Sequence, residues 1–316
     1  MKTIVINSND ANQRIDKFLQ KYFQDMPLSA IYKYIRKKRV KVNDKKVEIN
    51  YKLAENDKID LYINDEYFEN TKPAADFITI KPHLHILYED DNILLIDKKP
   101  GMVVHPDEFE KINTLINHIQ SYLYNKEEYV PDKENSFAPA LCNRIDRNTG
   151  GIVIAAKNAE TLRIINGKIK AKEIRKFYLC VIKGILTNKE GNLSDYLSRD
   201  YSAKKVTVSA KLELGSKQII TKYRVLNEKS NMSLLEVELI TGRTHQIRAH
   251  FSAMNHPLLG DPKYGDISFN HSIGFKYQAL YSYKVFFDFS SDAGKLDYLR
   301  GKVFEVKEVG FTKLFA

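Results

Sequence analysis

The chain has 316 residues and a formal net charge of +10 at pH 7. This length predicts two domains with a sizeable core, and the positive charge favours a polyanionic partner, most commonly nucleic acid. The two cysteines, Cys142 and Cys180, are too few for a disulfide framework or a cysteine zinc site. No apolar run suits a signal peptide or a membrane span. We therefore expect a cytoplasmic protein without a membrane partner.

The first predicted domain, residues 1–75, contains two helices followed by a hairpin. Apolar residues recur at helical spacing between Gln13 and Asp25. A second helix is predicted after Pro27, with Ser29 as a candidate N-cap. Apolar and charged residues then alternate on both sides of a turn over 43–46, which predicts two paired strands.

The second helix and the hairpin carry a strong basic excess. Between Lys33 and Lys46 the chain has eight Lys and Arg residues against a single acidic one, Asp44. A charged helix face is usually only solvated surface. Because here a helix and an adjoining hairpin share the excess, it favours contacts with an RNA backbone. The candidate RNA-binding residues are Lys33, Arg36, Lys37, Arg39 and Lys41.

This domain resembles RNA-binding domains of the ribosomal protein S-four type. The matching residues are Arg14–Leu19, Ser29–Asn43, Leu53 and Asp57. The sequence departs from the pattern at Lys38-Arg39, where the family usually has a glycine after the basic helix. The resemblance implies that residues 1–75 bind RNA.

A polar segment over 70–84, with Pro73 and Pro82, predicts a linker. We place the linker itself at 76–84 and a second domain at 85–316. Strands dominate this domain, and Asn158 is a candidate cap for a helix that reaches Ile169. The mixture predicts an α+β fold with a mixed, mostly antiparallel sheet. Strands are predicted at 86–88, 93–96, 102–104, 152–156, 177–182 and 234–240.

A polar, turn-forming segment, Asn143–Gly151, precedes a strongly apolar strand. It is therefore a loop held by a rigid element, which suits a functional site. Asp146 lies in this loop between Arg144 and Arg147. By pattern alone, Asp146 is as compatible with a surface turn as with catalysis.

A second polar segment, Thr241–His250, ends one strand and begins a helix. On this helix His245 and Arg248 share one face, and Arg248 can present a planar guanidinium to a carboxylate. His250 lies nearer the apolar face that includes Phe251, so we predict a core histidine there.

Four segments in order resemble the RluA family of RNA pseudouridine synthases. Together with the N-terminal domain they cover nearly the whole chain, and they look most similar to the RluC branch, which acts on large-subunit ribosomal RNA. The family pattern has His at Asn143 and Ser at Gly150, so the loop contacts with RNA are expected to differ. The four segments are Glu89–His105, Asn143–Lys157, Lys176–Gly184 and Thr241–Gly265.

The resemblance implies a set of site residues. The family's catalytic aspartate falls on Asp146, its conserved tyrosine on Tyr178 and its active-site arginine on Arg248. Arg144 corresponds to the arginine that enters the RNA stack, although a phosphate contact fits it equally well. Arg243 and His245 are further candidate RNA contacts.

Pseudouridylation breaks the bond between the base nitrogen and the ribose, rotates the uracil, and joins its carbon 5 to the ribose. Nothing is oxidised and no group is imported, so no cofactor and no metal is expected. The carboxylate of Asp146 either attacks carbon 1′ or removes the proton on carbon 2′. The target base must leave its stack, and Tyr178 is then placed to stack on it.

Other functions fit single features of the sequence. An RNA-binding ribosome assembly factor would explain the basic domain. The histidines suggest a metal-dependent hydrolase, but no metal-binding motif such as HExxH accompanies them. A phosphoaspartyl enzyme lacks its companion carboxylates, and a methyltransferase lacks its glycine-rich loop. We expect a monomer that acts on 23S ribosomal RNA or the assembling large subunit, with transfer RNA as the alternative substrate.

Overall fold

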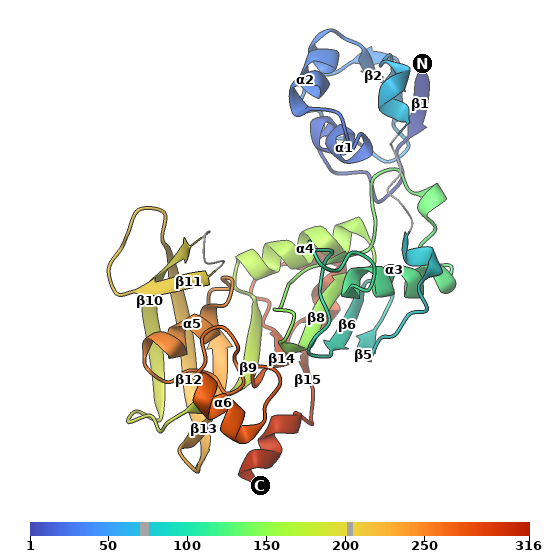
Figure 1. Cartoon of the computed structure of the whole chain (residues 1–316). Coiled ribbons are helices and arrows are strands. Elements are labelled where there is room, and N and C mark those ends of the chain that lie inside the picture. Colours follow the sequence, from blue (N-terminus) through green and yellow to red (C-terminus); the bar gives the residue numbers. More distant parts are fainter. Residues whose placement is uncertain (70–75, 201–204) are drawn as a thin grey trace. The chain divides into compact units, whose positions relative to one another are not determined.

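The computed structural model describes residues 1–69, 76–200 and 205–316 (Figure 1). These residues form two compact units. No helix within the described ranges is long and apolar enough to cross a membrane. The first unit is formed by Met1–Pro82, Ile116–Ala140 and Ala156–Leu162, and the second by His83–Leu115, Leu141–Ala155 and Arg163–Ala316.

The first unit begins with two helices and a small sheet around one apolar core. Helices α1 (Ile15–Tyr22) and α2 (Leu28–Arg36) confirm the two predicted helices, although α1 is shorter than the predicted range. Phe18 and Ile31 of these helices are buried together with Ile59 of the sheet. The sheet has the order β1-β4-β2-β3, formed by Lys2–Val5, Lys58–Leu61, Val40–Val42 and Lys45–Lys46.

Two details predicted for the second helix and the hairpin are wrong. Ser29 is not the N-cap of α2, because Pro27 takes that position and no side chain caps the helix. A proline suits a helix start because its φ is already fixed near the helical value. The turn is also shorter than 43–46, since Val42 pairs directly with Lys45. Only Asn43 and Asp44 turn, with φ values of 50° and 62°, as a tight two-residue hairpin requires.

From Ile116 on, helix α3 (Leu115–Asn125) belongs to the first unit, and it was not predicted. The described part of the predicted linker is not free chain. Residues 76–79 form a 3-10 helix, and the buried Phe77 packs its ring against Tyr124 and Tyr129. The start of the polar segment, residues 70–75, lies outside the described residues. Two further 3-10 helices are η1 (Asp65–Phe68) and η3 (Pro131–Lys133).

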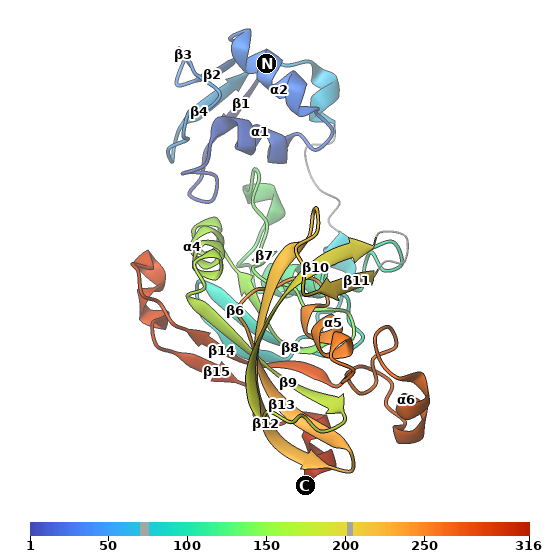
Figure 2. The same cartoon turned by 90° about the vertical axis from the view of Figure 1, so that its left-hand side faces the viewer.

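The second unit is built on one large twisted sheet (Figure 2). Its order is β11-β10-β12-β13-β9-β14-β8-β6-β5, with β15 beside β14 and β7 beside β8. Neighbours pair antiparallel from β11 to β14, whereas β14 and β8 pair parallel, which confirms a mixed, mostly antiparallel sheet. The strands are Ile86–Glu89, Ile93–Lys98, Ala140–Leu141, Gly150–Ala156, Ile174–Lys183, Glu190–Asp200, Lys205–Ser209, Lys217–Lys229, Met232–Leu239, Leu280–Phe287 and Val303–Glu305, numbered β5 to β15 in chain order.

Helices pack on this sheet and close its core. Helix α4 begins where predicted, and the amide of Thr161 donates to the Oδ1 of Asn158 at 3.0 Å, which confirms that cap. Helix α5 lies beside β10 and β11, where its Ala249 packs with Leu197 and Val206. The helical segments are α4 (Ala159–Lys170), α5 (Gln246–Ala253), α6 (Ile267–Ile273), η4 (Gly294–Leu299) and η5 (Gly310–Phe315).

The backbone geometry at Lys38 explains why the family usually has a glycine after the basic helix. The amide of Arg39 donates to the carbonyl of Tyr34, and that of Lys38 donates to the carbonyl of Ile35. These two hydrogen bonds form a Schellman motif, in which the residue at position 38 adopts a left-handed conformation. Lys38 has a φ of 62°, a region where a side chain is unfavourable and glycine is not.

Replacing Lys38 with glycine should therefore stabilise this domain by up to about 1 kcal/mol, because it relieves the left-handed strain. Hydrogen exchange of the amides over 28–42, followed by mass spectrometry on the full chain, would show slower exchange. Lys37→Gly is the matched control, because Lys37 has a φ of −76° and gains nothing from glycine. Equal effects of the two variants would contradict the strain argument.

Candidate active site

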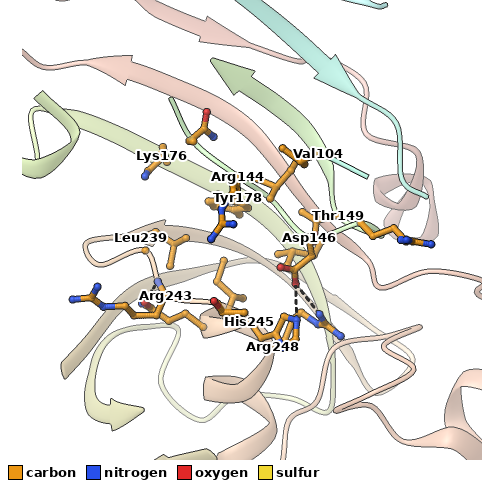
Figure 3. Close-up of a pocket in the computed structure, with 18 of the residues that line it drawn as sticks. Val104, Arg144, Asp146, Thr149, Lys176, Tyr178, Leu239, Arg243, His245 and Arg248 are labelled. Atoms are coloured by element: carbon orange, nitrogen blue, oxygen red, sulfur yellow. Dashed lines mark hydrogen bonds and ion pairs between the residues drawn. The ribbon is translucent and has the colours of Figure 1, made fainter. Parts of the chain in front are cut away.

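Asp146 and Arg248 are brought together from elements far apart in the sequence. Asp146 lies in the loop before β8, and Arg248 lies in the first turn of α5. The Nη1 of Arg248 donates to the Oδ2 of Asp146 at 2.7 Å (Figure 3). The side chain of Arg248 is 6% exposed and that of Asp146 is 25% exposed. Of the two, the carboxylate is therefore the more accessible to a ligand.

A second carboxylate fixes the orientation of Arg248. The Nε and Nη2 of Arg248 donate to the two oxygens of Asp261 at 2.7 and 2.9 Å, and Asp261 is fully buried. Burial alone would raise the pKa of Asp261, but its hydrogen bonds to Arg248 and the arginine charge lower it below the ordinary value. Burial likewise opposes the charge of Arg248, yet Asp261 and Asp146 raise its pKa. Both groups are therefore charged at neutral pH.

His245 is the second group beside Asp146. It lies at the N-cap of α5 with a φ of 54°, and its Nε2 is 3.8 Å from the Oδ2 of Asp146. Burial lowers the pKa of His245, and the charges of Arg248 and Lys263 act in the same direction. The sequence predicted His245 only as an RNA contact, whereas the fold places it against Asp146.

Tyr178 lies on β9 and lines the same cleft as Asp146. It is buried, and burial raises its pKa to about 12, with a further contribution from the charge of Asp146. The phenol is therefore protonated at neutral pH. A protonated phenol can stack and donate a hydrogen bond.

The cleft around these residues has a volume of about 630 Å³. Six predicted residues line it: Asp146, Tyr178, Arg248, Arg144, Arg243 and His245. Further cations join them, and burial lowers the pKa of one, Lys176. Basic side chains thus far outnumber the two acids of the lining, Asp107 and Asp146, which suits a phosphate backbone. The other basic lining residues are Arg147, Lys176 and Arg199.

The remaining predicted RNA-binding residues belong to the first unit and are not part of this cleft. Arg39 and the α2 residues are exposed, and Lys41 is half-buried on β2. Their role in RNA binding is still a prediction. The α2 residues are Lys33 and Arg36, together with Lys37 directly after the helix.

Lys98 supports the loop that carries Asp146. It is almost fully buried, and its Nζ donates to the carbonyls of Lys99, Met102 and Arg147 at 2.9 to 3.0 Å. Burial lowers its pKa to about 7, although Asp146 and Asp97 oppose this shift. A lysine so enclosed is a support of the loop rather than a contact for RNA.

The departures at Asn143 and Gly150 are both explained by internal packing. The Oδ1 of Asn143 accepts the amide of Ile154 at 2.8 Å, so this side chain is held by the backbone of β8. A Cβ on Gly150 would lie 2.3 Å from the ring of Tyr281. The hydroxyl of Tyr281 in turn donates to Asp97 at 2.5 Å, which fixes the ring in the space that the glycine leaves.

Comparison with known proteins adds an independent line of argument. The sequence matches the family model described as RNA pseudouridylate synthase over residues 92–253, and the S4 domain model over residues 13–59. An uncharacterized RNA pseudouridine synthase of Mycoplasma capricolum is 34% identical over 96% of each chain. The ribosomal large subunit pseudouridine synthase C of Buchnera aphidicola is 31% identical over 82% of this chain and 79% of its own.

A solved structure shows the same fold. The human protein named RNA Pseudouridylate Synthase Domain Containing 1 matches with a TM-score of 0.53 at 19% identity. The match covers 74% of this chain and 96% of the human one. The range of the synthase model includes Asp146, Tyr178 and Arg248.

Replacing Gly150 with serine should destabilise the protein by about 1–3 kcal/mol, because the new side chain overlaps the fixed ring of Tyr281. Urea denaturation of the full chain measures this change. Gly167→Ser is the control, because a Cβ there meets nothing within 4 Å. Equal stability of the two serine variants would show that the Tyr281 ring does not restrict this position.

Proposed function

Because the chain belongs to the RNA pseudouridylate synthase family, and is therefore an isomerase that converts uridine to pseudouridine in RNA, we propose that Asp146 is its catalytic carboxylate. The observation that carries this proposal is the 2.7 Å contact between Arg248 and Asp146 in a cationic cleft. We also propose 23S ribosomal RNA, free or in the assembling large subunit, as the substrate. The name of the Buchnera aphidicola relative supports that choice.

The described contacts of the Asp146 carboxylate all fall on one oxygen. Both Arg248 and His245 approach Oδ2. Oδ1 is thus the oxygen left to face the ribose of a bound uridine. The guanidinium of Arg248 holds Oδ2 in place for both mechanisms, whether the carboxylate adds to carbon 1′ or removes the proton on carbon 2′.

Tyr178 and Arg144 are proposed to handle the flipped nucleotide. Tyr178 stacks on the uracil and orients it while the base rotates and carbon 5 meets the ribose. Arg144 fills the vacated position in the RNA or contacts a neighbouring phosphate, and Arg243 contributes a further RNA contact. After the new bond forms, carbon 5 loses its proton and the former glycosidic nitrogen gains one, so the isomerisation balances without a cofactor.

The S4 domain is proposed to anchor the RNA. Lys33, Arg36 and Lys37 present exposed charges in and after one helix, which is the arrangement that tracks phosphates. Arg39 lies directly before β2 and Lys41 lies on it, where the ammonium of Lys41 is 5.2 Å from the ring of Tyr62. We further propose that the protein works as a monomer in the cytoplasm.

Asp146→Asn should bind RNA like the wild type but lose turnover by about 10³-fold or more, because an amide cannot act as a nucleophile or base. Tritium release from RNA labelled at uridine carbon 5 measures turnover, and filter binding measures affinity. Unmodified 23S ribosomal RNA and transfer RNA serve as parallel substrates. Faster release from transfer RNA would contradict the proposed substrate.

Asp107→Asn is the matched control for this experiment, since Asp107 is the other acid that lines the cleft. It should retain most of its turnover. Substantial release by Asp146→Asn would remove Asp146 from the mechanism. If the wild type bound both RNAs but released tritium from neither, the result would favour a role as a ribosome assembly factor.

Neutralising Lys33, Arg36 and Lys37 together with glutamine should weaken RNA binding and lower its salt dependence. Each lost phosphate contact reduces the slope of log affinity against log salt by about 0.7–0.9, so the slope should fall by roughly 2. Replacement of Lys302, Lys307 and Lys313, which are exposed residues outside the cleft and the S4 domain, is the charge-matched control. Equal slopes for the two triple variants would contradict the anchor.

A further inference from the structure

The hydroxyl of Tyr264 connects an edge strand of the sheet to His245. The backbone amide of Val206, on β11, donates to this hydroxyl at 2.9 Å, and the Nδ1 of His245 lies 3.0 Å from it. Strand β11 is the last of its sheet. The backbone of Tyr264 is itself fixed, because its amide donates to Asp261 and its carbonyl accepts the hydroxyl of Ser252, both at 3.0 Å.

The positions of the protons follow from these contacts. The amide of Val206 can only donate, so it occupies one lone pair of the tyrosine oxygen and leaves the hydroxyl proton for His245. If the proton of a neutral His245 were on Nδ1, the lone pair of Nε2 would face the carboxylate of Asp146. With the proton on Nε2, Nδ1 accepts from Tyr264 and an N–H faces Asp146. Only the second arrangement suits every neighbour.

The surroundings also disfavour the imidazolium form of His245. Arg248 from α5 and Lys263 from the following loop face it with positive charge, whereas Asp146 and Asp261 face it with negative charge. Burial contributes most and lowers the pKa. The ammonium of Lys205 lies 5.9 Å from the ring of Tyr264.

We propose that Tyr264 is a positioning residue, whose hydroxyl holds His245 as the neutral tautomer with its proton on Nε2, directed at Asp146. The proposal rests on the role given to Asp146 above. It adds a second N–H beside Arg248 at the same carboxylate oxygen. The 3.8 Å separation is longer than a hydrogen bond, so in the free enzyme the attraction is electrostatic.

Tyr264 and His245 connect the carboxylate of Asp146 to β10 and β11, the strands that border the cleft. Val206 pairs with Arg199 of β10, and Arg199 lines the cleft. RNA that contacts Arg199 therefore acts on the same strand pair that holds Tyr264. A displacement of β11 reaches Asp146 through two hydrogen-bonding side chains, Tyr264 and His245.

The first test is the tautomer of His245 in the free protein, measured by long-range ¹H–¹⁵N correlation spectra of the imidazole rings. His245→Gln identifies the signal. The wild type should show the proton on Nε2 at pH 7.5. A proton on Nδ1, or an imidazolium, would overturn the proposal. This measurement needs no RNA and no turnover, so its outcome is independent of the role of Asp146, which Asp146→Asn tests.

Tyr264→Phe removes only the hydroxyl, because the ring stays against the guanidinium of Arg248, 5.1 Å away. The hydrogen bond to Nδ1 stabilises the neutral ring, so its loss should raise the pKa of His245. The spectra should then show the Nε2 tautomer mixing with the Nδ1 tautomer, and imidazolium persisting to higher pH than in the wild type. An unchanged titration would overturn the proposal.

Turnover gives the second test. Tyr264→Phe should lower kcat by about tenfold while RNA affinity stays within about twofold, because the hydroxyl acts on the carboxylate and not on RNA. His245→Gln keeps an N–H donor near the position of Nε2. In the His245→Gln variant, Tyr264→Phe should therefore lower kcat no further. If Tyr264 had a purely structural role, the effects of the two substitutions on kcat would add.

The control for this cycle is Tyr223→Phe. The hydroxyl of Tyr223 donates to the carbonyl of Asn188 at 3.3 Å, and its ring contacts Phe251 of α5, but Tyr223 does not line the cleft. Turnover of this variant should equal that of the wild type. A loss in Tyr223→Phe as large as in Tyr264→Phe would show that any removed hydroxyl perturbs α5, and would contradict the proposal.

Discussion

The guanidinium of Arg248 is shared between two carboxylates, and the geometry of the cleft depends on this sharing. The fork of Nε and Nη2 is used entirely on the buried Asp261, which leaves Nη1 for Asp146. A buried acid without its partner costs about 3–5 kcal/mol, so Arg248 and Asp261 must be kept together for stability alone. Asp146 then meets a cation whose position is already set, and its orientation costs little extra when RNA binds.

The sheet supplies the rigidity that this pair needs. Tyr178 pairs with Val237 on one side and Ser282 on the other, so the tyrosine beneath the cleft belongs to a central strand. The loop is fastened at two points after Asp146. Lys98 holds the carbonyl of Arg147, and Gly150 lets the loop enter β8 against an aromatic ring. Residues distant in the sequence thus hold the strand of Tyr178 and the loop of Asp146 in place.

Whether the sequence predicted a feature depended on how local the signal for that feature is in the chain. Asn158 was found as a cap because the signal is local: a polar side chain precedes a helical pattern by a fixed spacing. Asp146 and Arg248 were predicted as site residues through motif resemblance. Asp261 was missed because one acid in a polar loop has no local signal, and only the fold brings it to the guanidinium. Ser29 was misjudged because Pro27 starts the helix without a side-chain cap.

The reaction explains why the protein combines a catalytic cleft with a separate S4 domain. In the proposed roles, Asp146 and Tyr178 address groups that every uridine shares, namely a ribose and a flat base. Discrimination between uridines must therefore come from contacts beyond the target nucleotide. Arg199 and Arg243 in the cleft, and the basic residues of the S4 domain, are the groups available for that purpose. If both sets of cations bind RNA as proposed, we expect selectivity to come from RNA shape that satisfies both sets, because phosphate contacts alone carry no sequence information.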